Sequence, residues 1–132
     1  MLPLTMIGRN VAFALLGAAA LVLKHSYAGV GQEVIHAYAG NSVVSFSLYF
    51  ALLGAVLRFP YPRLIDAVVV FLVVTAFEVT NGFGVMANVY DPFDIAANAA
   101  GIGLAVLVDM VSWRVLTGSG RLPTSGRTAR DG

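Results

Sequence analysis

The chain has 132 residues, and its composition excludes an ordinary soluble domain. Charged residues make up 11% of the sequence and hydrophobic residues 58%, whereas a typical soluble domain is roughly 25% charged. A chain with a mean hydropathy of +0.83 cannot cover a globule with polar side chains, so we predict a membrane protein with one domain. The net charge of +1 predicts no basic face for nucleic acid, and the lack of cysteine excludes a disulfide framework.

Four apolar segments predict four helices that cross the bilayer. Each approaches the roughly 20 residues that span the hydrocarbon core, and a backbone in lipid must satisfy its hydrogen bonds within a helix. We therefore predict an all-α fold, an integral membrane bundle of four transmembrane helices within residues 1–116. The polar segment 117–132 is predicted to be a disordered cytoplasmic tail. The predicted spans are residues 4–24, 41–59, 64–81 and 93–113.

The first apolar segment has a second interpretation, a cleaved signal peptide. Arg9 would supply its basic beginning and the small residues 18–20 its cleavage site. In the interpretation as a span, Arg9 is predicted to reach back to the lipid headgroups. Within the mixed segment 25–40, a short helix along the membrane surface is predicted around Val34, Ile35, Ala37 and Tyr38. No other ligand accompanies His25 and His36 at metal-binding spacing, so we predict solvated histidines, no metal and no cofactor.

The distribution of lysine and arginine predicts how the helices cross the membrane. If the N-terminus is cytoplasmic, the four spans leave only Lys24 outside and place all the arginines inside. Both termini are then in the cytoplasm, and Glu78 and Asp94 lie at the outer surface. The arginines on the inside are Arg9, Arg58, Arg63, Arg114, Arg121, Arg127 and Arg130.

Polar and small residues recur on one face of the last predicted span. Their spacing of four, three, four and four residues places them above one another on a helix. A charged group in the centre of a span costs about 2.5–3.5 kcal/mol, so this stripe is predicted to face another helix. Its predicted partner is the third span, which is joined to it by a short loop. The stripe contains Asp94, Asn98, Gly101, Ala105 and Asp109, and the partner face contains Thr75, Glu78, Asn81 and Gly82.

The outer ends of these two spans form the candidate site. Glu78 and Asp94 are predicted to lie at one depth, with Asn98 one turn deeper as a hydrogen-bond donor. Such a group suits three roles: binding a ligand or lipid headgroup, carrying a proton or cation, or tying two helices together. The sequence has no nucleophile with a base, no zinc-binding run and no phosphate-binding loop, so we do not predict an enzyme.

Two further features concern packing. At the inner ends of the spans, Asp66 is predicted to pair with Arg63, three residues away, and Asp109 with Arg114, five residues away. Small residues around Gly101 let helices approach closely, either within the bundle or between copies of the chain.

The polar stripe resembles a motif of the VanZ-like family, small bacterial membrane proteins named for a protein associated with teicoplanin resistance. The family has a glutamate near a span end, a glutamine three residues on and a short loop with an arginine. An aspartate follows, with an asparagine four residues on and a glycine three further. Asn81 stands in the glutamine position and Asn88 in the arginine position. The matching residues are Glu78, Asp94, Asn98 and Gly101.

The resemblance covers residues 41–109 and includes an earlier element of the family. That element has an acidic residue, a histidine four residues on and a tyrosine eight residues on. Asn41 and Ser45 replace the first two, and Tyr49 matches the third. The candidate ligand-binding residues are therefore Glu78, Asn81, Asp94, Asn98, Gly101 and Tyr49.

The resemblance implies a multi-pass protein of the bacterial inner membrane that acts in the cell envelope. Its expected partners are the lipid bilayer and either lipid-linked cell-wall material or a glycopeptide, and its expected effect is a change in teicoplanin sensitivity. Two alternatives come from the residues themselves. The chain could be a structural subunit of a homo- or hetero-oligomeric membrane complex, or a small carrier coupled to protons or cations.

Overall fold

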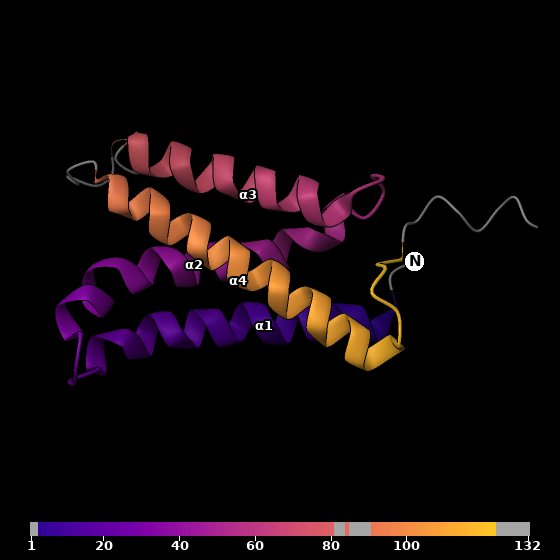
Figure 1. The fold of residues 1–132 in the computed structure, drawn as a ribbon, viewed down its shortest axis with the longest axis horizontal. Coiled ribbons are helices and arrows are strands. Elements are labelled where there is room, and N and C mark those ends of the chain that lie inside the picture. Colours follow the sequence, from indigo (N-terminus) through magenta and orange to yellow (C-terminus); the bar gives the residue numbers. More distant parts are fainter. Residues whose placement is uncertain (1–2, 81–83, 85–90, 124–132) are drawn as a thin grey trace, which may run out of the picture.

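The computed structural model describes residues 3–80, 84 and 91–123, and its main elements are four long helices (Figure 1). No strand occurs among these residues, so the prediction of an all-α fold is confirmed for the described part of the chain. The helices are α1 (Leu4–Leu23), α2 (Gln32–Val56), α3 (Pro62–Val79) and α4 (Pro92–Thr117), and a short 3-10 helix η1 (Lys24–Ser26) follows α1.

Helix boundaries follow local sequence signals. Proline at the first position starts both α3 and α4, where its missing N–H costs no helical hydrogen bond. Asp91 caps α4, since its side chain accepts a hydrogen bond from the Phe93 N–H at 3.0 Å. At the other end of α4, Gly118 adopts a φ of 71°, a left-handed conformation that glycine tolerates, and the helix stops there.

The second helix is central to the bundle. It packs against α1, α3 and α4, and α3 and α4 also pack against each other. The helices alternate in direction, so α2 and α4 are parallel (Figure 1). One end of the bundle contains the start of α1, the α2–α3 turn and the end of α4, and we call it the basic end. The opposite end contains η1, the end of α3 and the start of α4, and we call it the acidic end.

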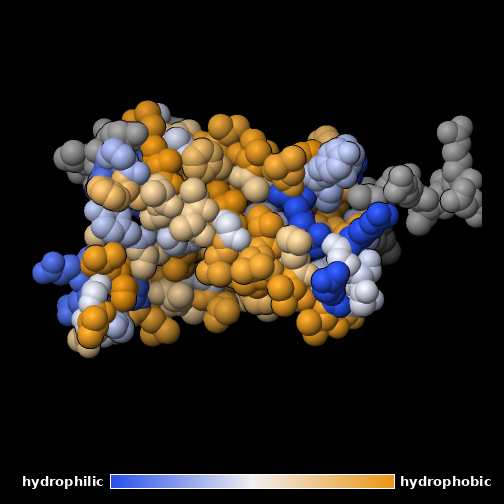
Figure 2. Space-filling view, viewed as in Figure 1, coloured by the Kyte–Doolittle hydropathy of each residue, from blue (hydrophilic) through white to orange (hydrophobic). Residues whose placement is uncertain are grey.

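Three of the four helices are long and apolar enough to cross a membrane: α1 with η1, α2 and α4. In the view of Figure 2, hydrophobic residues cover most of the middle of the bundle and hydrophilic residues gather towards its ends. Large side chains on this surface are well exposed, for example Leu15 at 63% and Leu107 at 58%. A surface of this kind suits lipid rather than water. The third helix has 18 residues and carries Arg63, Asp66 and Glu78.

The core contains aromatic rings between α1 and α2 and a close contact between α2 and α4. Phe13 of α1 stacks on Phe50 of α2 with ring centroids 4.8 Å apart. Gly101 of α4 lies against the backbone of Ser42 in α2, and a Cβ at this glycine would collide with the Ser42 carbonyl. The predicted close approach at Gly101 therefore occurs within the bundle.

The second helix is longer than the predicted span. It begins at Gln32 rather than at residue 41, so the surface helix predicted within 25–40 is the first part of α2. No proline interrupts residues 32–41, and hence nothing stops the helix from extending back from the span. Its last residue is Val56, three residues before the predicted end.

The predicted disorder of segment 117–132 is wrong for its first residues. The fourth helix continues to Thr117, and residues 118–122, which we call the strap, fold back against the basic end. Trp113 donates its indole N–H to the Arg121 carbonyl at 2.8 Å, and Leu122 is only 8% exposed. One apolar residue, main-chain carbonyls and the hydroxyls of Thr117 and Ser119 hold the strap, and composition does not reveal such contacts. The rest of the tail, 124–132, lies outside the described residues.

The contact between Gly101 and Ser42 can be tested by adding one methyl group. We expect Gly101→Ala to lower the free energy of unfolding by about 1–3 kcal/mol, because the backbones must separate. Gly103→Ala is the control, since nothing lies within 4 Å of its added Cβ. It should leave stability unchanged or raise it by up to about 1 kcal/mol, as alanine favours helix. Thermal unfolding in detergent measures both, and equal effects would contradict the close contact.

Candidate functional site

The polar stripe of α4 faces the bundle interior, as its spacing predicts. All five of its residues are buried. Asn98 is 2% exposed and Asp109 fully buried, while Asp94, nearest the acidic end, retains 9% exposure. The interior face of α4 was therefore predictable from the sequence.

The main partner of this stripe is α2 and not α3 as predicted, although α3 supplies Arg63, which binds Asp109. Asn41 donates its amide N–H to Asp94 Oδ1 at 2.7 Å, and one turn deeper Ser45 donates its hydroxyl to Asn98 Oδ1 at 2.8 Å. Between them, Ser42 donates to the Ala97 carbonyl at 2.7 Å. Because α2 and α4 are parallel, residues four apart on one helix meet residues four apart on the other.

Three carboxylates from α3 and the start of α4 lie together at the acidic end, apart from the exposed Glu33 of α2. Asp91 accepts a hydrogen bond from the Tyr38 hydroxyl at 3.1 Å, in addition to its capping bond. Glu78, near the end of α3, is half-buried and close enough to Asp94 to interact with it electrostatically. Asn81, the remaining predicted residue of this region, lies outside the described residues. The acidic end thus combines a carboxylate from α3 with two that side chains of α2 hold in place.

Tyr49 does not belong to this group. It is fully buried, and its hydroxyl donates to Asp109 Oδ2 at 3.2 Å towards the basic end. The structure therefore brings Glu78, Asp94 and Asn98 to one region, as predicted, and places Tyr49 elsewhere. The long tyrosine side chain carries its hydroxyl away from the α2 backbone to Asp109.

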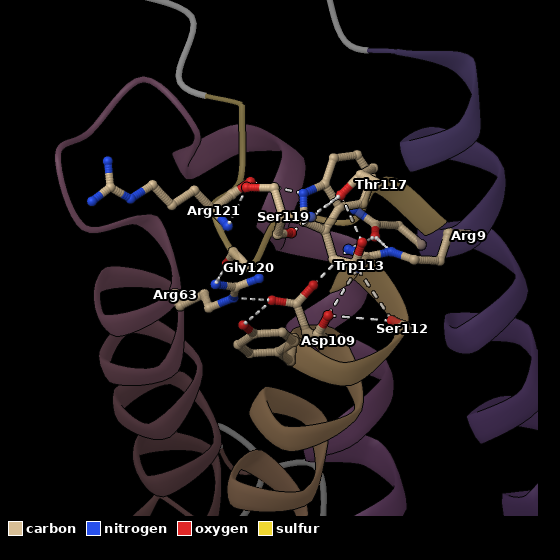
Figure 3. Close-up of polar contacts among 11 residues, drawn as sticks. Arg9, Arg63, Asp109, Ser112, Trp113, Thr117, Ser119, Gly120 and Arg121 are labelled. Carbon is tan, nitrogen blue, oxygen red and sulfur yellow. Dashed lines mark hydrogen bonds and ion pairs between the residues drawn. The ribbon is translucent and has the colours of Figure 1, made fainter. Parts of the chain in front are cut away.

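A second polar cluster surrounds the Asp109 carboxylate (Figure 3). Arg9 of α1 lies 2.6 Å from Oδ1, and Arg63 of α3 lies 2.5 Å from Oδ2, where the Tyr49 hydroxyl of α2 also donates. Groups from all four helices therefore meet at one buried carboxylate. The predicted pairing of Asp109 with Arg114 is wrong, because Arg114 is exposed and Asp109 points into the bundle.

Arg9 is buried inside the bundle rather than extended to the headgroups, contrary to the prediction. Its side chain is 4% exposed and lies over the rings of Phe50 and Trp113, 5.7 and 5.2 Å from their centroids. It also donates to Asn10 Oδ1 at 2.7 Å and to the Asp109 carbonyl at 3.2 Å. The contact between Arg9 and Asp109 could have been predicted from the sequence. An arginine inside an apolar span needs an acid at the same depth, and the predicted topology places Asp109 there.

Asp66 differs from Asp109 in having no partner. Its side chain is fully buried, and neither carboxylate oxygen accepts a hydrogen bond within the described structure. The predicted pairing with Arg63 is wrong, since Arg63 turns to Asp109 and to the Gly120 carbonyl of the strap.

A shallow apolar hollow of about 260 Å³ lies between α1 and α2. Its lining contains no charged side chain, so it offers contact for an acyl chain but nothing to orient a polar ligand. Among the described residues, no group of three histidine, cysteine, aspartate or glutamate side chains is arranged to hold a metal ion. Polar chemistry in the described structure is thus concentrated in the two clusters at the ends of the bundle.

No protein-family model, curated protein or solved structure matches this chain. The resemblance to the VanZ-like family stays a prediction from the residues at 41–109. What the chain does must therefore be argued from the geometry of the two clusters.

The two buried aspartates should respond differently to replacement by asparagine. Asp109→Asn leaves two guanidinium groups without their counter-ion, and we expect it to lower the free energy of unfolding by about 3–5 kcal/mol. Asp66→Asn removes no hydrogen bond or ion pair, so its effect should be much smaller. Thermal unfolding of the purified variants in detergent gives both values. A larger loss at Asp66 would contradict the central role of Asp109.

Proposed function

We propose that this chain is a four-span protein of the bacterial inner membrane that binds a polar envelope ligand at its acidic end. The ligand class is lipid-linked or cell-wall material, or a glycopeptide such as teicoplanin, as the VanZ-like resemblance implies. The supporting observation is that Glu78, Asp91 and Asp94 gather at one end of the bundle. In this orientation the basic end and both termini are cytoplasmic, as the arginine distribution indicates.

Fixed carboxylates suit ligand recognition better than mobile ones, because less side-chain freedom is lost on binding. Asn41 holds Asp94 and Tyr38 holds Asp91, each through a bond from α2 to the start of α4. An ionised carboxylate has about four acceptor positions, and Asp94 uses one of them for Asn41. The remaining acceptor positions suit the hydroxyl, amide and ammonium groups of sugars and peptides.

A structural role is the second candidate, and the bonds from α2 to α4 favour it. The Asn41–Asp94 and Ser45–Asn98 pairs connect two helices and are each worth on the order of 0.6–2 kcal/mol. In that case the polar stripe holds the subunit together for assembly into a larger membrane complex. Loss of the Asp94 charge would then change abundance or assembly instead of a ligand response.

The experiment compares Asp94→Asn with Glu33→Gln in a teicoplanin-sensitive host at matched membrane levels. Asparagine keeps the size of residue 94 and can still accept from Asn41, so the variant removes mainly the charge. Glu33 is an exposed carboxylate in the first turn of α2 at the same end, outside the proposed group. We expect the wild type and Glu33→Gln to reduce teicoplanin susceptibility and Asp94→Asn to lose the effect.

Other outcomes separate the candidates. If the wild type gives no protection, the glycopeptide form of the proposal is wrong. If Asp94→Asn protects as well as the wild type, the acidic end is not the site. If it reaches the membrane poorly, or its complex changes size on a native gel, the structural role is favoured.

A further inference from the structure

The basic end presents only positive charge among the residues that the structure describes there. Arg58, Arg114 and Arg121 are exposed, and the side chain of Arg63 is 20% exposed. The acids at this end, Asp66 and Asp109, are fully buried and reach no solvent. Asp109 is paired with Arg9 and Arg63, whereas the exposed Arg58, Arg114 and Arg121 form no ion pair with an acid among the described residues.

The strap gives one of these arginines a fixed position. Arg121 would belong to a free tail, but its carbonyl accepts the Trp113 indole N–H at 2.8 Å, and the neighbouring Gly120 carbonyl accepts from Arg63. Figure 3 shows Arg63 and Arg121 on the same side of Asp109, opposite Arg9. The strap thus binds Arg63 of α3 through the Gly120 carbonyl and presents Arg121 at the surface.

The turn between α2 and α3 adds a third cation and aromatic residues. Arg58 lies over the ring of Phe59, 5.0 Å from its centroid, and Tyr61 is 70% exposed. Aromatic side chains beside arginines are typical of the depth of lipid headgroups. Because α1, α2 and α4 are long enough to cross the bilayer, their ends reach that depth.

We propose that the basic end binds the phosphate of an anionic phospholipid headgroup through Arg58 and Arg121. Guanidinium groups bind phosphate oxygens through paired, charge-assisted hydrogen bonds, which distinguishes this contact from general attraction to the surface. Arg63 is engaged inside the bundle by Asp109 and the Gly120 carbonyl, and its third guanidinium nitrogen is buried, so the contact with phosphate comes from the exposed Arg58 and Arg121. The site lies at the opposite end from the acidic group and does not depend on the function proposed there.

Trp113 provides a built-in reporter, since the chain has only one tryptophan and it lies against the strap. The full-length protein is reconstituted in bilayers that mix phosphatidylglycerol with phosphatidylcholine, with bromine on the acyl chains of one lipid at a time. Bromine quenches tryptophan fluorescence at short range, so quenching reports which lipid lies beside this end. We expect stronger quenching when the bromine is on phosphatidylglycerol.

The variants are Arg58→Gln and Arg121→Gln, with Lys24→Gln as the control. Each arginine variant should lower the preference for the anionic lipid about fivefold, the effect of one surface charge near a membrane. The Arg121 variant keeps the carbonyl that binds Trp113, so the reporter stays in place. Lys24→Gln removes one charge at the acidic end and should leave the preference unchanged.

Three results would overturn the proposal. Equal quenching by the two brominated lipids would show that no anionic lipid is enriched. If the double variant Arg58→Gln/Arg121→Gln keeps the preference, groups other than these two arginines must cause it. Loss of the preference on adding inorganic phosphate at constant ionic strength would show that the site takes free phosphate and not the headgroup. An unchanged Trp113 emission spectrum checks that each variant is folded.

Discussion

The bundle depends on keeping charge inside an apolar protein only where it is paired. Asp109 meets this constraint with two arginines and a tyrosine, one group from each of the other three helices. A buried ion pair adds little net stability, because removing both charges from water is costly. What it supplies is specificity: rotation of α1, α3 or α4 would leave a charge without its partner, and rotation of α2 would remove the Tyr49 hydrogen bond, so the cluster fixes how the four helices face one another.

The remaining polar contacts divide the molecule into two unlike ends. Towards the acidic end, neutral donors on α2 hold the side chains of α4, as in the Asn41–Asp94 bond, and leave carboxylates near the surface. At the basic end, the acids are buried and the arginines reach the surface. The interior of one end uses hydrogen bonds and that of the other uses ion pairs, and the two surfaces carry opposite charge.

The periodicity of the sequence predicted the helices and the buried face of α4. It did not predict the contacts that long side chains make between helices. The four helices and the buried face of α4 follow from apolar runs and from spacing along one helix. The predicted main partner of that face was wrong because a short loop suggested α3, which contributes Arg63, whereas the parallel α2 carries Asn41 and Ser45 at the same spacing. Arg9 and Tyr49 were misplaced because long side chains contact residues that spacing does not bring near. The strap rests partly on main-chain carbonyls, which carry no sequence signal.

The separation of Arg9 from Asp109 has a consequence for biosynthesis. The two residues are 100 positions apart, in the first and last helices. During translation the arginine enters the membrane long before its counter-ion has been made. The first helix therefore carries an unpaired guanidinium until α4 has been made. A chain that ends before α4 would keep that charge unpaired in its apolar first helix.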